Sequence, residues 1–195
     1  VASLNDVDVN DISLVTSTGD IVTGIITAGN AGDVTLNSAG AITDDGDAAT
    51  VISADVLTAD ATGSITIDTT VASADISASA IGDIDIDETD GIMLADVDTT
   101  DGSITVDAGG QIMAMAVDAL APTSTGNVTL TTTAGGIATT TVNAADAVAL
   151  TADAGDISLA DVNAGTTLDV TATAGSIAQL AGSPTTVTSV DEATF

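Results

Sequence analysis

The sequence predicts an all-β protein, a right-handed parallel β-helix (β-solenoid) with about 20 residues per coil. Three observations predict this fold: a short glycine-containing motif that recurs along the chain, alternation of polar and β-branched residues after each copy, and a near-absence of aromatic side chains. The chain of 195 residues has room for one such array, and we expect a single unit over residues 1–195.

The recurring motif is Gly, then Asp, Ser or Asn, then Ile or Val, then a residue that is usually Thr or Ser, and often a second aliphatic residue. Full copies begin at Gly32, Gly63, Gly82, Gly102, Gly126 and Gly155, and a decayed copy begins at Gly175. From Gly63 onward the spacings are 19, 20, 24, 29 and 20 residues. A period near 20 indicates one coil per repeat, with glycine supplying the positive φ of tight corners. The two long spacings suggest loops, and residues 121–125 are the best candidate.

Weaker half-copies lie between the full ones, and they predict two or three short strands in each coil. Within a strand, Ile65 and Ile67 should face one side while Thr66 and Asp68 face the other. Stacking the coils then predicts one inward aliphatic column, formed by Ile65, Ile84, Ile104, Val128, Ile157 and Ile177. We find no segment with helical periodicity over ten residues.

The composition is acidic but apolar enough for a core. The chain has 27 Asp and 2 Glu, no Lys, Arg or His, a net charge of -29, and 45% hydrophobic residues. Without cations it cannot neutralise phosphate, so we expect no nucleic-acid binding, and anionic membranes should repel it. No apolar run has the length of a membrane span. The expected partners are cations, glycans, basic proteins and other copies of the chain.

Two acidic segments share the pattern D-x-D-x-x-D-G and suggest calcium binding. Their candidate ligands are Asp85, Asp87, Glu88 and Asp90 in the first, and Asp96, Asp98 and Asp101 in the second. Alternating carboxylates that end at a glycine turn are typical of loops that wrap Ca²⁺ in oxygen ligands. The alternative is that these segments, and the acidic turn at residues 44–47, are ordinary polar turns.

Carboxylates also gather on the predicted outer surface. Asp68, Asp87 and Asp107 should form one outward column, and Asp83 and Asp85 should share the outer face of one strand with Asp87. Paired carboxylates can hydrolyse polysaccharides. However, the chain has no His, Lys or Cys to activate a nucleophile, and its single aromatic residue is Phe195. We therefore interpret the carboxylates as a solvated acidic face and expect no enzymatic activity.

The run over residues 155–177 resembles the repeats of filamentous haemagglutinin-type adhesins, which are large exoproteins exported by two-partner secretion. The resemblance extends over about residues 12–178, while the absence of Lys and Arg departs from it. It implies a secreted, cell-surface parallel β-helix with a role in adhesion or fibre formation.

The resulting prediction is a structural rod, the shaft or self-assembling subunit of a bacterial surface fibre, adhesin or biofilm-matrix filament. A glycan- or host-binding adhesin module is the alternative, and a polysaccharide-degrading enzyme is the third possibility. Residues 1–12 show no cap, and residues 4–9 read as a strand, so the end of the rod should be open to self-association.

Overall fold

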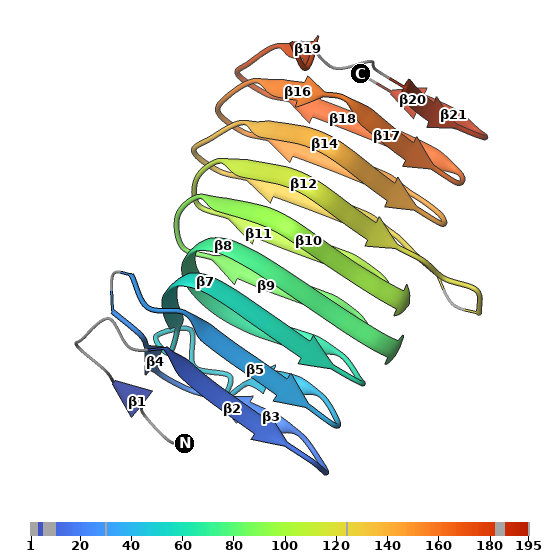
Figure 1. The fold of residues 1–195 in the computed structure, drawn as a ribbon. Coiled ribbons are helices and arrows are strands. Elements are labelled where there is room, and N and C mark those ends of the chain that lie inside the picture. Colours follow the sequence, from blue (N-terminus) through green and yellow to red (C-terminus); the bar gives the residue numbers. More distant parts are fainter. Residues whose placement is uncertain (1–3, 6–10, 30, 124, 182–185, 195) are drawn as a thin grey trace.

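The computed structural model describes residues 4–5, 11–29, 31–123, 125–181 and 186–194. This part of the chain is all-β and contains no helix, and its parallel strands stack as a β-solenoid of about 8 turns with roughly 20 residues per coil. The coils follow one another from the N-terminal end, drawn in blue, to the C-terminal end, drawn in red (Figure 1). The predicted all-β parallel β-helix is therefore confirmed.

One wall of the solenoid, which we call the β9 face, receives a short strand from each coil. It consists of β3 (Ile21–Thr23), β6 (Ile42–Asp44), the first part of β8 (Ile65–Ile81), β9 (Ile84–Glu88), β11 (Ile104–Ala108), β13 (Val128–Thr132), β15 (Val148–Ala152), β18 (Thr167–Ala172) and β21 (Glu192–Thr194). These strands are rich in Ile, Val and Thr, which favour extended backbone.

The opposite wall, the β10 face, carries longer strands. It consists of β2 (Ile12–Thr16), β5 (Val34–Ser38), β7 (Ile52–Ala61), the second part of β8, β10 (Ile92–Asp101), β12 (Ile112–Ala119), β14 (Ile137–Ala144), β16 (Ile157–Leu159), β17 (Asp161–Ala164), β19 (Ile177–Gln179) and β20 (Thr186–Ser189). Two further short strands are β1 (Leu4–Asn5) and β4 (Ile26–Thr27). β1 pairs with β4, and β4 pairs with the start of β7. Residues 6–9 of the strand expected at 4–9 lie outside the described residues.

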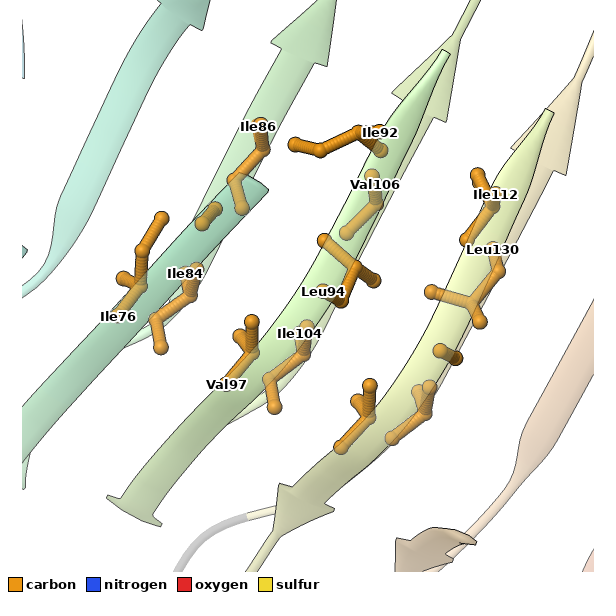
Figure 2. Close-up of a cluster of buried hydrophobic side chains, with 14 of the residues drawn as sticks. Ile76, Ile84, Ile86, Ile92, Leu94, Val97, Ile104, Val106, Ile112 and Leu130 are labelled. Carbon is orange, nitrogen blue, oxygen red and sulfur yellow. The ribbon is translucent and has the colours of Figure 1, made fainter. Parts of the chain in front are cut away.

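Stacked aliphatic side chains fill the space between the two walls (Figure 2). The inner column of the β9 face is formed by Ile42, Ile65, Ile84, Ile104, Val128, Val148 and Leu168. Ile84 is 1% exposed, which confirms the predicted assignment of inward and outward residues. Small and β-branched side chains suit this narrow interior, where a large aromatic ring would force the walls apart.

The predicted aliphatic column is wrong in its last two members. Ile157 pairs with Ile137 and Ile177 on the β10 face, not with Val128. The reason is that the Gly-Asp-Ile type of motif marks both corners of a coil, so it does not identify the face that follows it. The 29-residue spacing is therefore a change of corner and not a loop. The 24-residue spacing does contain a loop, between β12 and β13, as predicted, and residue 124 of the expected segment 121–125 lies outside the described residues.

The second residue of the motif links neighbouring coils. Its side-chain oxygen accepts a hydrogen bond from the backbone N–H of the equivalent residue in the next coil: Asp83 N–H donates to Ser64 Oγ at 3.2 Å, Ser103 N–H to Asp83 Oδ1 at 2.8 Å, and Asn127 N–H to Ser103 Oγ at 3.2 Å. We call this series the corner ladder. It explains why Asp, Ser and Asn occupy this position, because each offers a short side-chain acceptor.

Close approach of backbones explains most of the motif glycines. A Cβ on Gly102 would lie 2.2 Å from the carbonyl oxygen of Gly82 in the preceding coil, closer than any real contact. Among the glycines that begin the copies named above, positive φ occurs at Gly155 alone, where φ is 140°; Gly19, which begins the similar run Gly19-Asp20-Ile21, also has a positive φ of 80°. At Gly82, Gly102 and Gly175 the expected reason, positive φ, is therefore replaced by steric contact between stacked corners.

Candidate functional site

A column of carboxylates runs along the outer surface of the β9 face. Asp68 pairs with Asp87, and Asp87 pairs with Asp107, in successive coils. Because neighbouring strands lie about 4.8 Å apart, each of these groups has a like charge as its neighbour in the next coil. This carboxylate column confirms the register predicted from the sequence.

The same outer column changes its chemistry after Asp107. The next three positions are Thr131, Thr151 and Thr171, which we call the threonine column. The backbone register continues without interruption from one column into the other. This outer column therefore carries carboxylates over three coils and hydroxyl groups over the following three.

Burial and repulsion act together on the acidic side. The pKa of Asp68 is raised, first by partial burial and then by repulsion from Asp44 and Asp87. The pKa of Asp85 is also raised, again first by burial and then by Asp87 and Asp107. Both causes disfavour the ionised carboxylate. The chain has no Lys, Arg or His, so no side chain provides a compensating positive charge.

A hollow of about 280 Å³ lies against the carboxylate column and is partly bounded by Ala48 and Val51, which follow β6. The acidic turn of this segment is bonded internally. Gly46 N–H donates to Asp44 Oδ2 at 2.6 Å, and the Thr50 hydroxyl donates to Asp45 Oδ1 at 2.7 Å. The bond from Thr50 is the largest of the causes that lower the pKa of Asp45. The carboxylates of Asp44 and Asp45 therefore accept hydrogen bonds that stabilise the turn itself.

Glu88, at the end of β9, lies inside the solenoid and is only 4% exposed. Its Oε2 accepts hydrogen bonds from the Thr69 hydroxyl at 2.9 Å and from Val71 N–H at 3.0 Å, while Oε1 accepts from Asp90 N–H at 3.1 Å. Burial raises the pKa of Glu88, and the backbone and hydroxyl donors act in the opposite direction. The side chain fastens the corner after β9 to the preceding coil.

The residues proposed from the sequence as calcium ligands do not converge. Asp85 and Asp87 face outward, Glu88 faces inward, Asp90 is exposed in the following turn, Asp96 is exposed on β10, Asp98 is half-buried and Asp101 is buried. The cause is that β9 and β10 are extended strands, in which alternate side chains point to opposite sides. Within the described residues, no group of three or more His, Cys, Asp or Glu is arranged to hold a metal ion. Calcium binding stays a prediction.

Two of these residues have structural contacts on the β10 face. Asp98 Oδ2 accepts a hydrogen bond from the Ser77 hydroxyl of the preceding coil at 3.2 Å. The buried carboxylate of Asp101 accepts hydrogen bonds from the backbone N–H and the hydroxyl of Thr123, and so anchors the loop between β12 and β13. Buried acceptors of this kind are stabilising only while their donors remain in place.

Alternation already carried the signal that separates the inward acids from the outward ones. Glu88 lies two residues after Ile86 and four after Ile84, so it faces the same side of the strand as they do. Asp101 lies two residues after Thr99, which is buried. The same alternation applies to acidic and to aliphatic residues, and it places Glu88 and Asp101 inside the solenoid.

The fold and its surface define a class, a parallel β-solenoid with an acidic side wall. No protein-family model, curated protein or solved structure matches the chain. The resemblance of residues 155–177 to haemagglutinin-type repeats therefore stays a prediction. Where the structure describes the chain, none of its segments is a helix long and apolar enough to cross a membrane.

Proposed function

We propose that this chain is a structural extracellular protein, a rod that serves as the shaft or self-assembling subunit of a bacterial surface fibre, adhesin or biofilm-matrix filament. The observation that supports this proposal is the open-ended stacking of the coils. Each coil pairs with the next through parallel backbone ladders, so a further coil of similar shape can continue the rod without altering the preceding ones.

The strands at both ends of the described stack have one edge that pairs with no described strand. In the described part of the chain, β2 pairs with β5 and β3 with β6, while β20 pairs with β17 and β21 with β18; none of these four end strands has a second partner. A row of unpaired N–H and C=O groups is a template for pairing with another chain.

The inner columns are also less well covered at the C-terminal end. Ile177 and Val187 are only partly buried, whereas Ile157 and Val162, their partners one coil earlier, are fully buried. A coil from a second copy, or from a longer parent chain, would remove this apolar surface from water and pair the free backbone groups. Both effects favour end-to-end association.

Electron microscopy of the purified chain at increasing concentration tests the proposal. We expect filaments one solenoid wide, and a variant with a charge at the end strand, Val187→Lys, should shorten or abolish them. The control is Thr151→Lys, which places the same charge on the side wall. A monodisperse monomer at high concentration, unchanged by Val187→Lys, would contradict assembly through the ends.

A further inference from the structure

A second hollow among the described residues lies away from the carboxylate column. It has a volume of about 500 Å³ and lies at the corner where the chain passes from the β9 face to the β10 face. Its lining comes from successive coils: Ser53 pairs with Thr70, and Asp90 belongs to the coil after that. The hollow therefore runs along the rod axis.

The hollow exists because one coil takes the corner without a turn. β8 is continuous from Ile65 to Ile81, whereas the following coil interrupts its path with a turn between β9 and β10. The corner of β8 is consequently recessed below that turn. Glu88 holds the recess in shape, since it accepts hydrogen bonds both from Val71 N–H in the floor and from Asp90 N–H in the turn.

The lining combines small, hydroxyl and acidic side chains. Ala54 and Ala72 leave space above the backbone, and Ser53 and Thr70 lie beside them. Asp55 and Asp90 are exposed and belong to coils two steps apart, which corresponds to roughly 10 Å along the axis. This is a polar groove lined by two carboxylates and two hydroxyl groups.

The charge of the chain restricts what can enter. A net charge of -29 with no Lys, Arg or His repels anionic ligands and attracts cationic ones. The hydroxyl groups suit a ligand that is itself rich in hydroxyls, and the alanine floor allows a flat ring to lie close to the backbone. We propose that this groove binds a short oligosaccharide of amino sugars with free amines, its amines paired with Asp55 and Asp90 and its hydroxyls bonded to Ser53 and Thr70.

This inference goes beyond the structural role proposed above. The groove lies on the side of the rod, so its occupation does not require the ends to be free, and end-to-end assembly does not cover it. Failure of filament assembly would leave the sugar-binding proposal standing, and the reverse also holds.

Isothermal titration calorimetry at low ionic strength tests the proposal with four probes: a glucosamine tetramer, the N-acetylated tetramer, a galacturonic acid tetramer and spermidine. We expect binding of the glucosamine tetramer alone. Spermidine has amines without sugar hydroxyls, so equal binding of spermidine would overturn the assignment to a saccharide. Equal binding of the N-acetylated tetramer would overturn the role of the two carboxylates, and an absence of heat with all four probes would overturn the site.

Variants locate the binding on the groove. Ala72→Ile fills the hollow from its outward side, and the double variant Asp55→Asn/Asp90→Asn removes its charges; each should weaken binding about tenfold or more. The matched controls are Ala149→Ile and Asp153→Asn/Asp169→Asn, on other outward positions, and they should bind like the unmodified chain. Equal weakening by variants and controls, or no weakening by either, would mean general attraction to an acidic rod and would overturn the proposal.

Discussion

The carboxylate column and the threonine column occupy the same wall of the same solenoid, yet they differ in charge. Behind Asp87 and behind Thr151 the interior is alike, with fully buried aliphatic side chains in unbroken register. On the outside, one stretch stacks like charges and raises carboxyl pKa values, while the other stacks neutral hydroxyls. The comparison indicates that the buried aliphatic side chains determine the path of each coil. The outer positions can carry charged or neutral side chains, and the fold tolerates the charges without depending on them.

The largest expected effect comes from charging the interior that both stretches share. Ile84→Asp behind the carboxylate column and Val148→Asp behind the threonine column should each lower the free energy of unfolding by roughly 3–5 kcal/mol, because each buries an unpaired charge. Urea denaturation followed by circular dichroism measures this. If only one of the two variants were destabilised, the interiors would not be equivalent and the comparison would fail.

A smaller effect is expected from the polar groups that close the inner columns. Glu88→Ala leaves the donors of Thr69, Val71 and Asp90 without their acceptor and should cost about 1–3 kcal/mol. Thr132→Ala, in the threonine stretch, removes one bond to the Gly135 carbonyl, 2.7 Å long, and should cost about 1 kcal/mol. An unchanged or higher stability of Glu88→Ala would show that desolvation of the carboxylate outweighs its hydrogen bonds.

Exchanging the outer residues tests the difference itself. Asp87→Thr removes a charge flanked by Asp68 and Asp107 and should stabilise the rod by about 1 kcal/mol at low salt, the size of the repulsion between two charges in water. Thr151→Asp has no carboxylate above or below it in the column, so its destabilisation should be smaller. Thermal melts of the two variants at low ionic strength decide this, and equal and opposite shifts would argue against repulsion within the column.

Acidification should reduce the difference between the two stretches. The pKa values of Asp68, Asp85, Asp98 and Glu88 are all raised in the folded chain, primarily by burial. The folded state then binds protons more tightly than the unfolded state, so stability increases as the pH falls from neutral toward the ordinary carboxyl values of 3.8 and 4.5. The lowered pKa of Asp45 acts in the opposite sense. We expect a higher Tm at about pH 5 than at about pH 7, and a Tm that falls steadily on acidification would contradict this.

The smallest expected effect is that of salt. Added NaCl should raise the Tm by screening exposed carboxylates, and CaCl₂ at matched ionic strength, after exhaustive chelation, should raise it further if specific sites exist. The control is the same titration on Asp87→Thr, which should respond less to NaCl. Equal effects of the two salts would reduce the calcium hypothesis to screening, and no response to either would remove it.

Much of the fold follows from the sequence because a solenoid repeats one local rule. Alternation identified Ile65, Ile84 and Ile104 as inward and Asp68, Asp87 and Asp107 as outward, and the structure confirms both columns. The placement of Ile157 failed because both corners of a coil need the same close-packed glycine, so the motif alone cannot tell which face follows it. To assign a distant strand to its face from the sequence, the residues must be counted through both corners of every coil.

The candidate site was less predictable, for a different physical reason. Spacing along the chain suggested that Asp85, Glu88 and Asp90 could wrap one cation, but an extended strand sends them to different sides. The groove beside Ala72 forms because neighbouring coils follow different paths at this corner. The recess arises only when the coils stack, so no local sequence pattern predicts it.

The loop between β12 and β13 has a consequence for engineering. The coil from Ile112 to Ile137 spans 25 positions, against 20 from Ile137 to Ile157, yet the pairing on both sides of the extra residues is regular. The solenoid therefore tolerates added chain at this corner, where Asp101 anchors Thr123. A peptide epitope or a small folded domain inserted beside Pro122 should be carried on the outside of the rod at a fixed height, which makes the chain a candidate scaffold for ordered display.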